Sequence, residues 1–214
     1  MRRGKFIVLE GGEGAGKSTN LEWIRDRLAA GGIKVITTRE PGGTPFGEKL
    51  RSVLLDPTSR IVPDAELLLM FAARAQHLHE IIKPALESGS WVICDRFTDA
   101  SYAYQGGGRG VNLQYIEFLE HWIQEGLYPD LVLLFDMPVE TGLLRTHRRG
   151  NTADRFESEQ RAFFERVREA YLRRAQSSPE RHRVIDAALD LPQVQQQIEA
   201  ALGHLSADGG GNAV

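Results

Sequence analysis

Short apolar runs alternate along the chain with longer stretches in which apolar residues recur at helical spacing. The apolar runs are rich in β-branched residues and unbroken by polar ones, which is typical of parallel strands buried on both faces. Strands are therefore expected at residues 5–10, 34–38, 91–95 and 131–136, and a weaker fifth strand ends at residues 184–186.

Amphipathic helices are expected at residues 18–30, 46–55, 64–87 and 192–202. Gly31 and Gly32 end the first of these, and Asp64 can cap the third. Pro84 lies near the end of the third helix, where it can introduce a kink. Strands alternating with helices predict a doubly wound α/β fold, here a five-stranded parallel sheet with helices on both faces.

No internal repeat or linker divides the chain, so one domain is expected over residues 1–205. The glycine-rich end, residues 206–214, is expected to be disordered. The chain has 214 residues, 42% of them hydrophobic and 26% charged, which is ordinary for a soluble globular protein. A net charge of −3 gives no sign of a nucleic-acid or membrane surface.

The only cysteine, Cys94, excludes an internal disulfide and fits a reducing compartment, so a cytoplasmic protein is expected. Cys94 lies in the middle of a predicted strand, where an inert core role is expected. The apolar stretch at residues 67–73 is far too short to cross a bilayer.

Residues 11–18, GGEGAGKS, match the phosphate-loop pattern G-x-x-x-x-G-K-[ST], and they lie between a predicted strand and a predicted helix. The glycines let backbone N–H groups turn toward phosphate oxygens at the positive end of the helix. Lys17 can bridge the β and γ phosphates, and the Ser18 hydroxyl can bind Mg²⁺. The expected nucleotide-binding residues are Gly11, Gly12, Glu13, Gly14, Ala15, Gly16, Lys17, Ser18 and Thr19.

Two aspartates at predicted strand ends are candidates for the Mg²⁺ shell. Asp95 ends the strand WVICD, and Asp136 ends the strand LVLLFD; periodicity does not choose between them. We favour Asp95, because Arg96 follows it and offers a guanidinium fork suited to a second phosphate. A structural ion pair is an equally good interpretation of these two residues taken alone.

A second basic cluster lies at residues 145–155, within a segment of about residues 145–157 that is a candidate lid. Arg145 and Arg149 are four residues apart and share a helix face, Arg148 is adjacent, and Arg155 follows a Gly-Asn break. A solvated charged helix end is the simplest interpretation of this pattern. The alternative is a mobile lid that brings arginines to a transferring phosphoryl group and excludes water.

Several stretches, taken together, resemble bacterial thymidylate kinases, which are nucleoside monophosphate kinases with a phosphate loop. The resemblance runs from residue 6 to residue 202, and it implies transfer of the γ-phosphoryl of ATP to dTMP, giving ADP and dTDP for dTTP biosynthesis. It also implies a Mg²⁺ requirement and a homodimer. The stretches that carry it are EGGEGAGKS (10–18), TREPGGT (38–44), FAAR (71–74), DRF (95–97), SYAYQGGGRG (101–110) and the arginine-rich lid.

The resemblance gives Glu13 a role that its position in a phosphate loop leaves unexplained. In the enzymes that the chain resembles, the acid at this position points away from the triphosphate and accepts a hydrogen bond from the 3′-hydroxyl of dTMP. A carboxylate near polyphosphate is tolerable where a hydroxyl donor and nearby cations offset the repulsion. Pairing of Glu13 with a lid arginine remains the alternative.

The resemblance also implies the rest of the dTMP site. Phe71 should stack on thymine and Arg74 should donate to its O4, although taken alone these are an ordinary core residue and a surface charge. Ser101 should meet the base edge, and Tyr104 should exclude a ribose 2′-hydroxyl. Tyr102 has no assigned role. The expected dTMP-binding residues are Glu13, Arg51, Phe71, Arg74, Arg96, Ser101, Tyr104 and Gln105, with Arg39 as a second phosphate candidate.

The mechanism implied in this way needs no general base, because the acceptor phosphate is already ionised at neutral pH. Positioning and charge stabilisation then carry the reaction. The expected catalytic cations are Lys17 and Arg96. The enzymes that the chain resembles carry an additional basic residue either in the phosphate loop or in the lid. Since the loop has no arginine here, the resemblance implies that a lid arginine adds the transition-state charge, from among Arg148, Arg149 and Arg155.

Three alternatives remain. The acceptor could be another nucleoside monophosphate, such as UMP, CMP or dGMP. A nucleotide-driven switch is disfavoured because the chain has no N-K-x-D guanine signature. An inactive homologue is disfavoured because Lys17, Asp95 and Arg96 are all present. A homodimer is expected to bury apolar residues of the long helix at residues 65–87.

Overall fold

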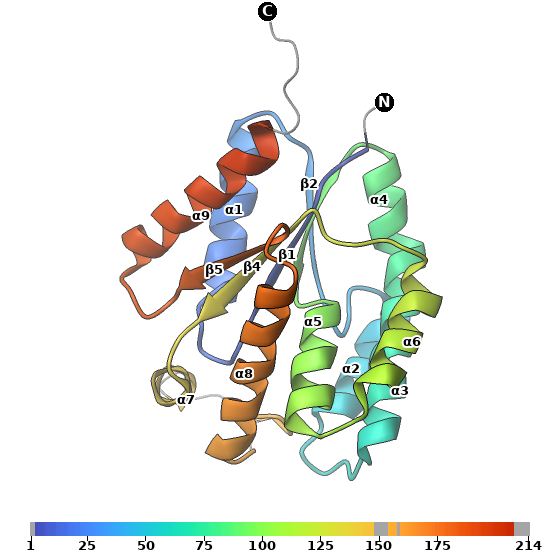
Figure 1. Cartoon of the computed structure of the whole chain (residues 1–214). Coiled ribbons are helices and arrows are strands. Elements are labelled where there is room, and N and C mark those ends of the chain that lie inside the picture. The colour runs from blue at the N-terminus through green and yellow to red at the C-terminus, as the bar shows by residue number, and fades with distance from the viewer. Residues whose placement is uncertain (1–2, 148–153, 158, 208–214) are drawn as a thin grey trace, which may run out of the picture.

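The computed structural model describes residues 3–147, 154–157 and 159–207 of the chain. Its centre is one parallel sheet with the strand order β2-β3-β1-β4-β5 (Figure 1). This confirms the predicted five-stranded α/β fold. The strands are β1 (Phe6–Gly11), β2 (Val35–Arg39), β3 (Trp91–Asp95), β4 (Leu131–Asp136) and β5 (His182–Asp186).

Alternate residues of the central strands face opposite layers of helices, as the period of two in a strand requires. Ile7 and Leu9 of β1 lie in the core that α1 (Lys17–Ala30) and α9 (Leu191–Ala207) cover. Phe6 and Val8 belong to the core on the other face (Figure 1). Burial of each such side chain contributes about 1.5–3 kcal/mol.

The helix expected at residues 64–87 forms as one continuous helical run in three parts. These are α3 (Pro63–His77), the π-helical turn η1 (Leu78–Ile82) and α4 (Lys83–Glu87). A proline ring clashes with the carbonyl four residues earlier, here that of Glu80. The wider π turn accommodates Pro84 without ending the helix.

Several helical segments were not predicted. They are α5 (Thr98–Ser101), the π-helical η2 (Tyr102–Gly108), α6 (Leu113–Gln124) and α8 (Arg161–Ser177). Because glycine has a low helix propensity, the consecutive glycines at the end of η2 do not indicate a helix in the sequence. The remaining helices are α2 (Pro45–Leu55), as predicted, and α7 (Val139–His147), which carries Arg145. None of the described helices has the length and apolar character needed to cross a membrane.

The C-terminal helix corrects one boundary. Because α9 continues to Ala207, the first two residues of the segment expected to be disordered are helical. Residues 208–214, and residues 148–153 and 158 of the expected lid, lie outside the described part of the chain.

The carboxyl ends of the strands position the candidate site. β1 lies between β3 and β4, so the strand order reverses there, which is where open α/β sheets bind ligands. The phosphate loop leaves the end of β1, and Asp95 ends the neighbouring β3. Arg39 at the end of β2 lies opposite Asp95 in the register. Three functional segments therefore meet at one edge of the sheet.

Candidate active site

The phosphate loop has the backbone that its glycines predict. Gly14 and Gly16 have φ values of 72° and 83°, in the left-handed region that favours glycine. A Cβ on Gly14 would lie 2.2 Å from the carbonyl oxygen of Gly142 in α7, so no side chain fits there. Gly16 caps α1, whose first turn contains no acidic residue. The positive end of α1 is thus open to an anion.

Lys17 lies buried across this loop. Its Nζ donates to the carbonyl oxygens of Gly11 and Gly12, at 3.1 and 3.0 Å. Burial, and then repulsion from Arg96, lower the pKa of the lysine. A bound anion would compensate for both effects.

A cavity of about 250 Å³ opens beside the loop, and we call it the main cavity because the phosphate loop lines it. It brings together most of the residues predicted for both substrates. Those that line it are Glu13, Gly14, Ala15, Gly16, Lys17, Ser18, Arg51, Arg74, Asp95, Arg96, Ser101, Tyr104 and Gln105. Arg39 lines it as well, whereas Gly11 and Gly12 border a smaller cavity of about 30 Å³ and Thr19 is exposed on α1.

Glu13 has hydrogen-bond partners inside the main cavity. Arg96 donates to its Oε1 through Nη2 at 2.5 Å, and the hydroxyl of Tyr104 donates to the same oxygen at 2.9 Å. An arginine at the end of β3 therefore pairs with this acid.

Arg96 has an unusual backbone for an arginine, with a φ of 67° in the left-handed region. Its N–H donates to the carbonyl oxygen of Leu9 at 2.9 Å. Its guanidinium lies over the ring of Tyr104, 4.8 Å from the centroid. The turn directs this side chain back toward the phosphate loop, where Nη1 also donates to the carbonyl oxygen of Gly11 at 3.0 Å.

The two aspartates considered for Mg²⁺ have different surroundings. Asp95 lines the main cavity with Ser18, and its buried Oδ1 has no hydrogen-bond partner among the described residues. Asp136 accepts two hydrogen bonds from Arg168, at 2.7 and 2.9 Å. An oxygen left without a donor fits a hydrated cation, so the geometry favours Asp95. Mg²⁺ needs only one or two carboxylates besides substrate phosphates, so the lack of a larger acidic cluster in the described part of the chain is no obstacle.

Arg74 is a buried cation that is fixed on one side and free on the other. Its Nε donates to Glu40 at 2.7 Å, and its Nη2 donates to the Phe97 carbonyl and the Ser101 hydroxyl at 3.0 and 3.1 Å. His77 hydrogen-bonds with the other oxygen of Glu40 at 3.0 Å. The remaining nitrogen, Nη1, is buried with no partner in the described part of the chain.

Phe71 does not have the position predicted for a base-stacking residue. It is 2% exposed and packs in a core cluster with Leu67 and Tyr102, outside the cavity lining. The guanidinium of Arg74 lies 4.5 Å from its ring centroid. Phe71 therefore packs against the guanidinium of Arg74, and the preceding residue, Met70, lines the cavity instead.

Two further arginines enter the cavity from the β2 side. Arg51 donates to the carbonyl oxygen of Pro41 at 2.9 Å, and the Glu40-Pro41 bond is cis, as predicted. Burial, and then the charge of Arg39, lower the pKa of Arg51. Arg39 itself is exposed and paired with Glu48 at 2.9 Å. Of the two, Arg51 is the better placed to gain from an incoming phosphate.

The predicted lid arginines are only partly described. Arg155 does not line the main cavity; its Nη2 pairs with Glu66 at 2.6 Å and its Nε donates to the Leu54 carbonyl at 2.7 Å. Gln105 donates to the other oxygen of Glu66 at 2.8 Å. Arg145 donates to the Ala187 carbonyl at 3.0 Å. Arg148 and Arg149 lie outside the described residues.

Four residues that organise this site were not predicted: Glu10, Glu40, Glu66 and Tyr171. The three acids are almost completely buried, and buried acids are rare unless they are paired. Glu10 follows an apolar run in the sequence, which is the one available signal. The partners of the other two acids come from distant segments, so sequence spacing gave no indication of them.

The chain is similar to known thymidylate kinases in sequence and in fold. The family model described as thymidylate kinase matches residues 9–198. A thymidylate kinase from Ectopseudomonas mendocina is 57% identical over 203 residues, covering 94% of this chain and 96% of the relative. One from Methylococcus capsulatus is 58% identical over 207 residues, covering 97% and 99%. A crystal structure of thymidylate kinase from Ehrlichia chaffeensis superposes with a TM-score of 0.76 at 32% identity, covering 94% of this chain and 99% of that one.

The Glu40–Arg74 pair gives a testable stability effect. Glu40→Gln leaves a buried arginine without its counter-charge, so the free energy of unfolding should fall by about 3 kcal/mol at pH 7. Burial alone would raise the pKa of Glu40, but Arg74 and His77 outweigh it and hold the pKa below its ordinary 4.5. The stabilisation is therefore present above pH 4.5 and is lost as the pH falls through the lowered value.

Urea titrations of both proteins between pH 7 and pH 3 measure this difference, which should shrink in the acid range. Glu199→Gln is the matched control, because Glu199 pairs with Arg27 on the surface and its loss should change little. Equal stabilities of wild type and Glu40→Gln at pH 7 would contradict the assignment.

Proposed function

The chain belongs to the thymidylate kinase family, and we propose that its main cavity is where the γ-phosphoryl group of ATP passes to the phosphate of dTMP, giving ADP and dTDP. One observation carries the proposal. A phosphate loop and a group of arginines line the same cavity, so that two anionic groups can meet between them.

The phosphate loop and Lys17 form the donor side. Backbone N–H groups at the start of α1 would hold the β and γ phosphates, and Lys17 would exchange its two carbonyl contacts for phosphate oxygens. Ser18 and Asp95 would hold Mg²⁺, which neutralises charge on the transferring group when it is bound. The unpartnered Oδ1 of Asp95 supports this assignment.

The acceptor phosphate would lie between Arg51 and Arg96. Both line the cavity, and Arg96 presents a planar fork of donors that matches phosphate geometry. Because the acceptor is already ionised near neutral pH, no group has to remove a proton from it. These residues act by holding two anions in line and compensating their repulsion. The expected contribution of Arg148 and Arg149 stays a prediction.

The base and sugar of dTMP would occupy the deeper part of the cavity. The free Nη1 of Arg74 is a buried donor that a thymine carbonyl would satisfy. Met70 would contact the ring in place of Phe71, and Ser101 and Gln105 would line its edge. Glu13 and Tyr104, which are hydrogen-bonded to each other, would face the deoxyribose.

We also propose a homodimer, formed through the exposed side of α6. Tyr115, Phe118 and Trp122 share one face of this helix and are 60 to 64% exposed. Leu68 on the adjacent α3 is 58% exposed. Such a set of large apolar side chains is typical of a permanent interface. A cytoplasmic location fits the single cysteine, which is buried and free.

Substrate preference tests the function directly. With ATP and Mg²⁺, ADP release should depend on the acceptor and be fastest with dTMP. Loss of one methyl group in dUMP should cost roughly tenfold or more in kcat/KM, and UMP should react more slowly still because of Tyr104. Equal or faster turnover of UMP, CMP or dGMP would indicate another monophosphate kinase, and acceptor-independent hydrolysis would indicate a nucleotide-driven switch.

The choice between the two aspartates predicts a difference in metal dependence. Asp95→Asn should raise the Mg²⁺ concentration for half-maximal activity by about tenfold or more, because it weakens an oxygen ligand of the metal shell. Asp136→Asn removes only the partner of Arg168 and should leave this concentration within about twofold. Mg²⁺ titrations of the two variants that gave the reverse order would transfer the role to Asp136.

The dimer is tested by light scattering coupled to size-exclusion chromatography. The wild type should have a mass near twice the 23.9 kDa of one chain. Trp122→Glu places a charge in the apolar patch of α6 and should shift the protein to monomer. Leu191→Glu changes an exposed apolar residue on the opposite side of the sheet and should leave the dimer intact. A monomeric wild type at micromolar concentration would exclude the interface.

A further inference from the structure

We propose that Glu10 and Tyr171 are positioning residues, which together hold Arg96 in the orientation that receives the acceptor phosphate. Neither side chain belongs to the phosphate loop or lines the main cavity, and neither was predicted to act in the site. The inference rests on the proposed role of Arg96 in binding that phosphate.

A chain of hydrogen bonds joins the three side chains. Nη1 of Arg96 donates to the hydroxyl oxygen of Tyr171 at 3.0 Å, and that hydroxyl donates to Oε2 of Glu10 at 2.8 Å. Each group donates toward the carboxylate, so an ionised Glu10 orients the tyrosine hydroxyl, and the hydroxyl then presents a lone pair to the guanidinium.

Glu10 also fixes the backbone next to Arg96. Its Oε1 accepts the N–H of Phe97 at 2.8 Å and the N–H of Ala100 at 3.3 Å. These amides follow Arg96, whose left-handed backbone is unfavourable for a residue other than glycine. One carboxylate therefore holds both the strained turn and, through Tyr171, the guanidinium.

The position of Glu10 is costly for a charged group. It is 1% exposed, and the other strand residues of β1 are apolar or glycine. Burial, followed by repulsion from Asp99, raises the pKa of Glu10 to about 7. An apolar side chain would be buried here without the desolvation cost of a carboxylate, so packing alone does not explain the acid. The contacts with Tyr171 and with the turn after Arg96 provide one.

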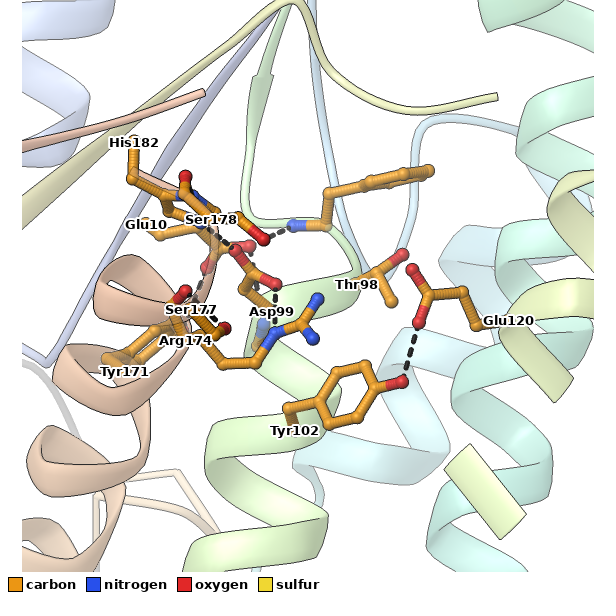
Figure 2. Close-up of polar contacts among 12 residues, drawn as sticks. Glu10, Thr98, Asp99, Tyr102, Glu120, Tyr171, Arg174, Ser177, Ser178 and His182 are labelled. Atoms are coloured by element: carbon orange, nitrogen blue, oxygen red, sulfur yellow. Dashed lines mark hydrogen bonds and ion pairs between the residues drawn. The ribbon is translucent and has the colours of Figure 1, made fainter. Parts of the chain in front are cut away.

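The neighbouring acid, Asp99, is compensated separately. Arg174 and His182 contact its two oxygens at 2.8 and 2.6 Å, and Figure 2 shows this group between α8 and the start of α5, with Glu10 and Tyr171 beside it. Arg174 and His182 direct these hydrogen bonds to Asp99, and within the described part of the chain neither hydrogen-bonds to Glu10. The cation that Glu10 reaches through Tyr171 is Arg96.

Tyr171→Phe isolates this effect, because it removes one hydroxyl and keeps the ring that packs edge-on against Tyr104 at 6.3 Å. Calorimetric titration should compare dTMP with thymidine, which has the same base and sugar but no phosphate. The variant should bind dTMP about tenfold more weakly, as expected for one lost contact to a charged group. Thymidine binding should stay within about twofold, and kcat should fall.

Two reference variants make the result decisive. Tyr102→Phe deletes another buried tyrosine hydroxyl, one that donates to Glu120 at 2.6 Å (Figure 2), and it should leave the ratio of dTMP to thymidine affinity unchanged. Arg96→Lys should lower that ratio strongly. Glu10→Gln should lower it as Tyr171→Phe does; if this variant does not fold, Tyr171→Phe carries the test.

The outcomes separate the two proposals. A reduced ratio in Arg96→Lys and Tyr171→Phe, but not in Tyr102→Phe, supports the positioning role. If Arg96→Lys reduces the ratio and Tyr171→Phe does not, or if Tyr171→Phe weakens both ligands equally, the positioning role is wrong and the role of Arg96 stands. An unchanged ratio in Arg96→Lys overturns the proposed role of Arg96, and the inference with it.

Discussion

The constraint on which this structure depends is the repulsion between two phosphate groups that have to approach within bonding distance. A protein overcomes it with fixed positive charge in a site that contains little water. In the proposed site, Lys17, Arg51 and Arg96 would provide that charge from the phosphate loop, α2 and the end of β3. Burial lowers the pKa of Lys17 and of Arg51, and a neighbouring arginine adds to this, Arg96 for Lys17 and Arg39 for Arg51. Anionic substrates would compensate both effects.

Acidic side chains hold two arginines of the site, Arg96 and Arg74, in place. Glu13 holds Arg96 from the loop side, Glu10 reaches it through Tyr171, and Glu40 fixes Arg74. Buried ion pairs add little net stability, because desolvation offsets much of the attraction. Their value here is geometric, since each leaves its arginine with a defined direction. The free nitrogen of Arg74 illustrates this: the other two nitrogens are bound, so the third has one orientation.

The sequence predicted the parts of the fold and site that depend on local pattern. Buried strands, the phosphate loop and the acid that ends β3 can all be identified from neighbouring residues. Contacts between distant segments could not be predicted in this way. Phe71 and Met70 are adjacent on α3, and only the packing of α3 against α6 and η2 decides which faces the cavity. The role of Glu66 likewise depends on Gln105 and Arg155, which are 39 and 89 positions away from it in the sequence.

The central strand explains why so much of the site can be rigid. β1 continues directly into the phosphate loop, carries Glu10, and pairs with β3 so that Leu9 receives the backbone N–H of Arg96. The donor loop and the positioning acid therefore belong to one buried strand, and the acceptor arginine directly follows β3, which pairs with that strand. The distance between the two phosphate sites could change only if the sheet core deformed, and the core is the stiffest part of such a fold. Tyr171 links α8 to this group through its hydrogen bonds with Arg96 and Glu10.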